Sequence, residues 1–137
     1  MEFVATVDQI DFYNDSISTI PQSTIAALEA IENVNTLILG GMDRGIDYTP
    51  LIKIFTDSTV ENFIFTGKAG ERMMQLCKAG ENKKCYFSNN YEEIVAIAKK
   101  VTRKNHACLL SPAASSYDAF KNFEERGNLY KELIQKT

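Results

Sequence analysis

The chain has 137 residues, which fits one ordinary domain, and its 45% hydrophobic and 24% charged residues are typical of a globular protein. No apolar run approaches the roughly 20 residues that a membrane-spanning helix needs, so we expect no membrane insertion. A net charge of −3 with interspersed signs disfavours binding to nucleic acid. The N-terminal residues lack the features of a secretory signal, so we expect a cytoplasmic protein.

Three cysteines, Cys77, Cys85 and Cys108, are odd in number and show no C-x-x-C spacing. This pattern argues against a disulfide framework and against a zinc site. We therefore expect free, buried thiols and no metal site in this chain.

A hairpin is predicted at the N-terminus, with strands at 3–7 and 10–13 around the polar pair Asp8 and Gln9. A helix at 21–31 follows, because Pro21 suits a first helical turn and apolar residues recur at helical spacing. Beyond it, short apolar strands at 36–39, 62–66, 84–87 and 107–110 alternate with helices at 49–55, 69–78, 91–100 and near 128–135. The alternation predicts an α/β fold: a Rossmann-like, mainly parallel sheet with helices on both faces and an antiparallel N-terminal hairpin strand.

Ligands of such sheets lie beyond the carboxyl ends of the strands, and two loops there are long and polar. The first contains Gly40, Gly41 and Gly45, whose spacing matches no phosphate-binding loop and instead indicates a tight strand exit. Arg44 in this loop is either a solvated charge or a carboxylate ligand. In the second loop, Ser116 and its neighbouring serines can cap helices or bind an anion. No Ser, Cys or Thr has a credible local base, so we predict no catalytic residue in this domain.

Three segments, 12–19, 37–51 and 109–127, together resemble the C-terminal domain of the Mur ligases, and in particular that of the D-glutamate-adding members. The third is the most specific, because the family pattern LSPA-x-x-S-x-D-x-F-x-N-F-x-x-RG is matched at every fixed position from Leu110 to Gly127. By order and spacing of segments, the resemblance covers residues 1–137 as a single domain. Residues 1–20 would form its hairpin and entry loop.

The resemblance implies an ATP-dependent ligase of peptidoglycan precursor synthesis, and through it a role in cell wall biogenesis, cell shape and cell division. In that family ATP, with Mg²⁺, activates UDP-N-acetylmuramoyl-L-alanine as an acyl phosphate, and the amine of D-glutamate attacks it. The domains that bind the UDP-sugar and ATP precede this one, and we expect them to be absent from this chain. Alone, the chain should be a catalytically inactive monomer that binds D-glutamate.

Carried over from the family, the D-glutamate contacts fall on Thr19, Arg44, Ser116 and the backbone N–H of Phe123. This set is physically sensible, because D-glutamate presents two carboxylates that need cationic, hydroxyl and amide donors.

Asp15 and Ser16 resemble residues on the ATP side of the family's site. The chain departs from the family nearby, with Ile17 in place of a Lys, Ile20 in place of an Asn and Met42 in place of an Asp. We hypothesise that the lost Lys and Asp are partners in relatives, and that an apolar contact between Ile17 and Met42 replaces them.

Two alternatives remain open. The chain could be the C-terminal domain of another Mur-type or folylpolyglutamate-type ligase. It could also be a stand-alone Rossmann-like binding or regulatory module.

Overall fold

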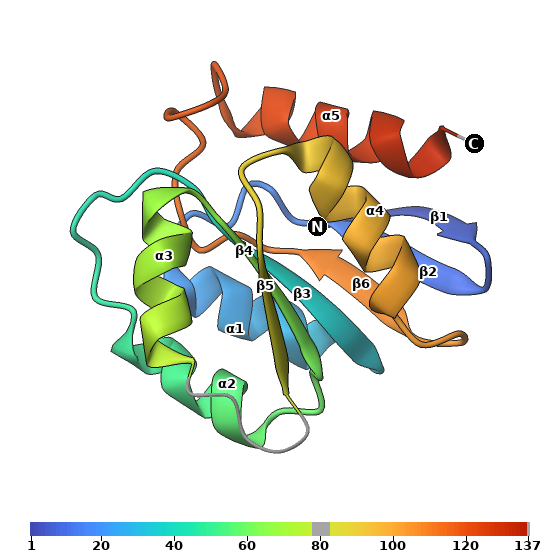
Figure 1. Ribbon diagram of the computed structural model, residues 1–137, viewed down its shortest axis with the longest axis horizontal. Helices are drawn as coiled ribbons and strands as arrows, with labels where there is room; N and C mark the ends of the chain where they lie inside the picture. The colour runs from blue at the N-terminus through green and yellow to red at the C-terminus, as the bar shows by residue number, and fades with distance from the viewer. Residues whose placement is uncertain (78–82, 137) are drawn as a thin grey trace.

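The structure is a computed structural model that describes residues 1–77 and 83–136. Within these residues, strands form one sheet in the order β1-β2-β6-β3-β4-β5 (Figure 1). The strands are β1 Glu2–Val7, β2 Ile10–Asn14, β3 Val34–Gly40, β4 Asn62–Thr66, β5 Lys84–Phe87 and β6 Ala107–Leu110. β1 pairs antiparallel with β2, whereas the β2–β6, β6–β3, β3–β4 and β4–β5 pairs are parallel. The predicted mainly parallel sheet with an antiparallel hairpin at its edge is confirmed.

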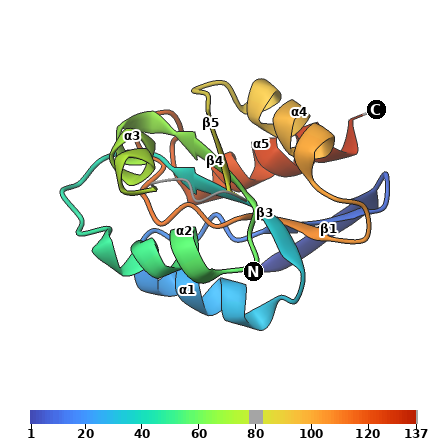
Figure 2. The same ribbon diagram turned by 60° about the horizontal axis from the view of Figure 1, so that its bottom comes forward.

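Helices cover both faces of this sheet (Figure 2). They are α1 Pro21–Ala30, the short 3-10 helix η1 Thr49–Leu51 with α2 Ile52–Asp57, α3 Gly67–Leu76, α4 Tyr91–Val101 and α5 Phe123–Gln135. The apolar residues of α1, α2 and α3 pack into one core, and those of α4 and α5 pack into a second. The buried strand β3 contributes alternate residues to the two cores: Leu37 and Leu39 pack into the first, and Ile38 packs into the second.

Two predicted helix starts were wrong. α3 begins at Gly67 rather than at residue 69, and its predicted end at Lys78 lies outside the described residues. α5 begins at Phe123 rather than near 128, after Asn122 caps it by accepting a hydrogen bond from the N–H of Glu125 over 2.8 Å. The polar run with a glycine in its middle hid this first turn from the sequence pattern.

Gly127 lies inside α5 because the helix packs closely on the end of β2. A Cβ at this position would stand 2.8 Å from Nδ2 of Asn14. A glycine that costs helix propensity therefore allows the close approach of α5 to the sheet.

The exit of β3 has the geometry that the glycine pair predicted. Gly40 has φ +121°, and a Cβ there would stand 2.0 Å from the backbone oxygen of Thr66. Gly41 has φ +150°, and its Cβ would stand 2.3 Å from the backbone oxygen of Ser115. Only glycine fits both positions without a backbone shift, so the tight strand exit is confirmed.

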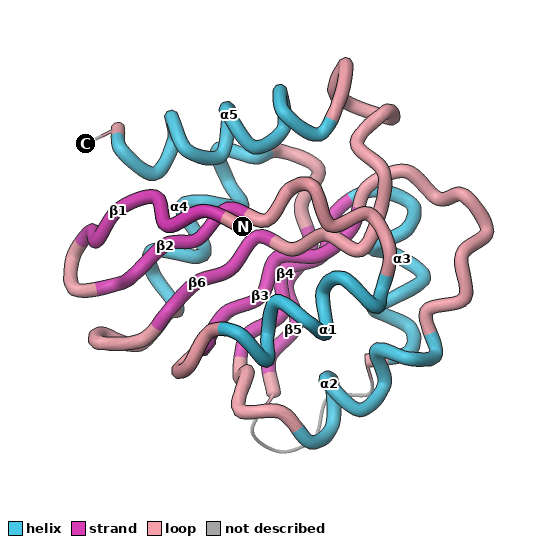
Figure 3. Tube along the Cα trace, turned by 180° about the vertical axis from the view of Figure 1, so that it is seen from behind, coloured by secondary structure: helices cyan, strands magenta, loops and turns pink. Residues whose placement is uncertain are grey.

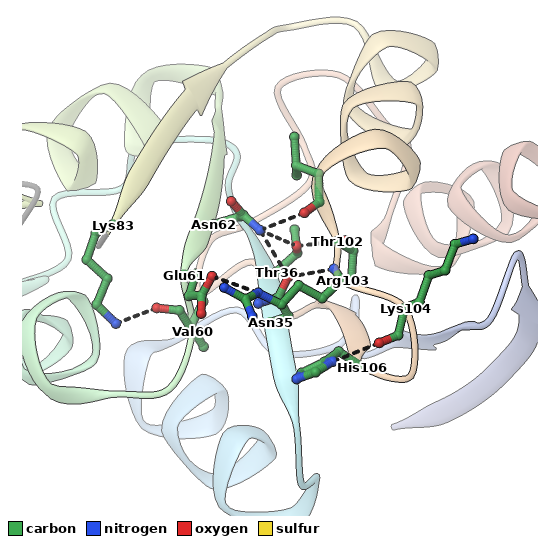
Figure 4. Close-up of polar contacts among 11 residues, drawn as sticks. Asn35, Thr36, Val60, Glu61, Asn62, Lys83, Thr102, Arg103, Lys104 and His106 are labelled. Atoms are coloured by element: carbon green, nitrogen blue, oxygen red, sulfur yellow. Dashed lines mark hydrogen bonds and ion pairs between the residues drawn. The ribbon is translucent and has the colours of Figure 1, made fainter. Parts of the chain in front are cut away.

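The opposite, amino edge of the sheet is held by a buried polar network (Figure 4). Nδ2 of Asn62 donates to Oδ1 of Asn35 over 3.1 Å and to Oγ1 of Thr36 over 3.2 Å. Oγ1 of Thr102 donates to Thr36 over 2.7 Å, which ties the end of α4 to β3. These groups satisfy one another, so this edge is structural. Among the described residues, no helix is long and apolar enough to cross a membrane.

Candidate functional site

The loops that leave β2, β3 and β6 gather at the carboxyl edge of the sheet, on the left of Figure 1 and on the right of Figure 3. All the residues predicted for ligand binding come from these loops and from the start of α5. The β3 and β6 loops are joined by the N–H of Met42, which donates to the backbone oxygen of Ser115 over 2.8 Å. The backbone therefore brings the segments of Arg44 and Ser116 next to each other.

Asp15 ties the exit of β2 to the exit of β6. Its N–H donates to the backbone oxygen of Leu110 over 2.7 Å, and its Oδ2 accepts from the hydroxyl of Ser111 over 2.9 Å and from that of Ser18. Asp15 is 5% exposed. This residue, predicted to reach toward ATP, is thus already engaged inside the domain.

Ser16 is a buried link between the β2 loop and the start of α5. Its hydroxyl donates to the backbone oxygen of Phe123 over 2.7 Å and accepts from Nε of Arg126 over 2.9 Å. Nη2 of Arg126 donates to the backbone oxygen of Ser16 over 2.7 Å. Two segments that are distant in sequence, the β2 loop and the start of α5, are fixed to each other here, because the guanidinium is planar and its donors have fixed directions.

The four residues predicted to contact D-glutamate differ in exposure. Arg44 is exposed in the β3 loop, and it forms no ion pair or hydrogen bond with residues 1–77 or 83–136. Thr19 and Phe123 are half-buried, and Ser116 is 2% exposed. Phe123 is the first residue of α5, so its N–H is one of the amide donors that a helix start leaves without an intrahelical acceptor.

The electrostatics of this edge are dominated by buried groups. Burial lowers the pKa of Arg126 and raises the pKa of Asp118. The charge of Asp118 partly offsets the shift of Arg126, and the charge of Arg126 partly offsets that of Asp118. Since a guanidinium keeps its proton even so, Arg126 places a permanent positive charge behind the β2 and β6 loops. That charge favours anionic ligands at this edge.

Two hollows open near these residues. The smaller, of about 290 Å³, is lined in part by Ser16, Ile17 and Phe123. The larger, of about 530 Å³, lies between α3, α4 and α5 and is lined in part by Arg126 and Asp118, but by none of the six predicted site residues. Among the described residues, no group of three or more His, Cys, Asp or Glu side chains could hold a metal ion.

Comparison with known proteins decides the family. The profile of the family described as "Mur ligase, glutamate ligase domain" matches residues 1–114. The chain belongs to this family. Proteins named UDP-N-acetylmuramoylalanine--D-glutamate ligase are similar to this Mur ligase domain: that of Geotalea uraniireducens (strain Rf4) is 40% identical over 98% of the chain, and that of Caldanaerobacter subterraneus is 37% identical over 98%.

The Mur ligase domain spans about 30% of the length of these relatives, 29% of the first and 30% of the second. Its fold is similar to part of a crystal structure of a murein peptide ligase from Psychrobacter arcticus, with a TM-score of 0.57. That alignment covers all of this chain and 30% of the other, at 11% sequence identity. The likeness supports the fold of the Mur ligase domain.

The hypothesis of an apolar contact between Ile17 and Met42 is not supported. Their side chains are 56% and 37% exposed, and neither joins the two apolar cores. Around Ile17 the polar neighbours Ser16 and Ser18 are the buried residues, so the loop turns Ile17 outward.

Sequence reasoning missed Arg126. It is a fixed position of the Mur ligase pattern, but an arginine in a polar helix start is read as a solvated charge. The signal that could have found it is the adjacent Gly127, since a glycine inside a helix indicates close packing against another segment. Close packing of this turn makes its neighbour Arg126 a buried residue, which needs partners.

Proposed function

We propose that this chain is the D-glutamate-binding domain of an ATP-dependent, amide-forming ligase of peptidoglycan precursor synthesis. One observation carries the proposal: relatives named UDP-N-acetylmuramoylalanine--D-glutamate ligase align with 98% of the chain at 37% and 40% identity. The geometry supports it, because the loops that carry the predicted contacts are joined at one edge of the sheet.

In the proposed site, the donors divide between the two carboxylates of D-glutamate. Arg44 offers a guanidinium that can grip one carboxylate with two hydrogen bonds, and the hydroxyl of Thr19 would complete this end. The hydroxyl of Ser116 and the N–H of Phe123 would hold the other carboxylate. The amine between them is left free to attack, which is what an amide-forming reaction requires of its acceptor.

The rest of the proposed reaction depends on parts of the site outside this chain. ATP, with Mg²⁺, would convert the carboxylate of UDP-N-acetylmuramoyl-L-alanine to an acyl phosphate on the domains that bind these substrates. Asp15 and Ser16 would lie toward ATP in the assembled site, where they would hold the β2 loop in place. We therefore expect the chain alone to be inactive, monomeric and able to bind its amino acid only weakly.

The test is a titration of the ¹⁵N-labelled chain with D-glutamate, with L-glutamate as the matched control. We expect amide shifts around Thr19, Arg44, Ser116 and Phe123, with a Kd on the order of millimolar or weaker for D-glutamate and a weaker response to the L-isomer. Shifts confined to other parts of the chain, or an equal response to both isomers, would contradict the proposed site. A stronger response to a different amino acid would indicate another Mur-type ligase.

A pair of arginine variants refines the assignment. Arg44→Ala should weaken D-glutamate binding about tenfold or more, because a carboxylate loses its charged partner. Arg103→Ala is the control, since Arg103 is exposed at the opposite edge of the sheet and pairs with Glu61 over 3.3 Å. Equal affinities of the two variants would remove Arg44 from the site.

A further inference from the structure

The larger hollow of the domain has no part in the proposed D-glutamate site. Its volume of about 530 Å³ lies within the usual range for pockets that bind small molecules. It is bounded by the N-terminus of α3, the first turn of α4, the start of α5 and the loop that precedes α5.

Arg126 lines this hollow, and one of its guanidinium nitrogens is buried without a hydrogen-bond partner among the described residues. Nε and Nη2 are turned to Ser16, on the side of β2. Nη1 lies on the other side, 3.1 Å from the position that a Cβ on Gly41 would occupy, and both Gly41 and Arg126 line the hollow. Among the described residues Nη1 has no hydrogen-bond partner, although Arg126 is 1% exposed. A buried N–H group of a charged side chain without an acceptor is unfavourable, so this donor points to a ligand.

No carboxylate of the described chain balances this charge at contact distance. Asp118 also lines the hollow, but it forms no ion pair with Arg126. Burial raises the pKa of Asp118, which disfavours its charged form, whereas the guanidinium of Arg126 keeps its proton. A positive charge therefore faces the hollow without a close partner.

A second unpaired donor lies at the same hollow. The hydroxyl of Tyr91 is buried and has no partner among the described residues, and Tyr91 is 8% exposed. Tyr91 and Arg126 are close enough for each to influence the pKa of the other. The Tyr91 ring meets Phe120 edge-to-face at 5.3 Å between ring centroids, and with Leu129 these rings give the hollow an apolar wall.

We propose that this hollow binds a small monocarboxylate with an apolar or aromatic body. The carboxylate accepts hydrogen bonds from Nη1 of Arg126 and from the hydroxyl of Tyr91, and the body of the ligand lies against Phe120 and Leu129. A singly charged group fits better than a phosphate, because the hollow offers one buried cation, and Lys68 at its edge is already paired with Glu71 over 3.5 Å. The apolar wall and the single buried cation also disfavour a dicarboxylate such as glutamate.

Benzoate is the probe, and the 137-residue chain is titrated with it while amide and arginine side-chain signals are followed. We expect shifts at Gly41, Asn89 and the Nε–H of Arg126, with a Kd on the order of 1 mM, as suits a ligand of this size. Benzamide, the neutral isostere, should bind at least about tenfold more weakly, and phenyl phosphate no more tightly than benzoate. Equal binding of benzoate and benzamide, or no saturable shift at these residues, would overturn the proposal.

Tyr91→Phe is the decisive variant, because Arg126 also holds Ser16 and its replacement can unfold the domain. Removal of the Tyr91 hydroxyl should weaken benzoate binding about fivefold without loss of stability, since the hydroxyl has no partner in the free domain. Tyr48→Phe is the matched control: its hydroxyl is also buried and unpaired within the described residues, but it lies in the other core and not at the hollow. Unchanged binding in Tyr91→Phe, or an equal loss in Tyr48→Phe, would count against the site.

The proposal stands apart from the D-glutamate assignment. D-glutamate should perturb Thr19 and Arg44, benzoate should not, and the two ligands should bind without competition. Either assignment can therefore fail while the other holds.

Discussion

Arg126 donates two hydrogen bonds to Ser16, from Nε to the hydroxyl over 2.9 Å and from Nη2 to the backbone oxygen over 2.7 Å. The Ser16 hydroxyl in turn donates to the backbone oxygen of Phe123 over 2.7 Å, which closes a ring between α5 and the β2 loop. The loop that carries Thr19 is thereby fixed to the helix whose first N–H belongs to Phe123. The geometry of the proposed D-glutamate site therefore depends on Arg126, although Arg126 is not one of the proposed ligand contacts.

Arg126→Ala should lower the free energy of unfolding by about 2–4 kcal/mol, because it leaves both the hydroxyl and the backbone oxygen of buried Ser16 without a donor. Urea denaturation measures the loss. Arg103→Ala, which removes an exposed ion pair with Glu61, is the control and should change stability by less than about 1 kcal/mol. Similar losses in the two variants would show that the Ser16 link is not important for stability.

Gly40→Ala should destabilise the domain severely, by about 3 kcal/mol or more, or prevent folding. The added Cβ would meet the backbone oxygen of Thr66 at 2.0 Å, so the β3 and β4 exits would have to separate. Gly45→Ala is the matched control: Gly45 also has positive φ, +72°, but its Cβ would meet nothing within 4 Å. The free energy of unfolding of that variant should fall by only about 1 kcal/mol, because its backbone is strained but its added Cβ meets no neighbour. Thermal or urea unfolding of both variants separates the clash from the strain.

The sequence predicts the layers of this fold well because its apolar strands alternate with helices at regular spacing. Strands β4, β5 and β6 have the predicted bounds, and the hairpin turn lies at Asp8 and Gln9, both with positive φ. The start of α5 could not be predicted, since its first turn is polar and its packing depends on Asn14, which is distant in sequence. Local patterns do not contain such tertiary contacts.

The sequence indicates which loops form the candidate site, but not the hydrogen bonds that these loops make within the domain. A resemblance to a family indicates which residues matter, yet Asp15 and Ser16 prove to be buried and bonded to their own domain. The hollow beside Arg126 could not be predicted at all. It depends on two buried donors, in α4 and α5, that lack partners in the described chain, and burial of single polar atoms is invisible in a sequence.

Stability should fall in alkali in part because of Cys108. This thiol is 0% exposed, and burial raises its pKa from 9.0 to about 12. A raised pKa in the folded state contributes stability that is fully present below the unfolded value, near pH 9, and is lost as the pH rises toward 12. For each pH unit in this window, the free energy of unfolding should fall by up to about 1.4 kcal/mol. Cys108→Ala should be less stable than the unaltered protein at pH 7, because the substitution leaves a cavity. Between pH 9 and 10.5, however, its free energy of unfolding, measured with urea, should fall by less than that of the unaltered protein. Parallel curves for the two proteins would contradict this assignment.

Cys77 and Cys85 should form a disulfide under mild oxidation, although both are free thiols in this structure. Their Sγ atoms lie 3.1 Å apart, so bond formation needs an approach of only about 1 Å.

With oxidised glutathione, the thiolate of the more exposed Cys85 would attack the glutathione disulfide and release one glutathione. The thiolate of Cys77 would then attack the mixed disulfide and release the second. Burial raises the pKa of Cys77 to about 12, so the second step should be slow at pH 7 and faster at pH 9.

Mass spectrometry should find a loss of two hydrogens and one remaining free thiol, that of Cys108, which is the internal control because it is fully buried. Cys77→Ser should instead retain glutathione on Cys85. A stable glutathione adduct on the unaltered chain, or a disulfide-linked dimer, would show that the two thiols do not meet in solution.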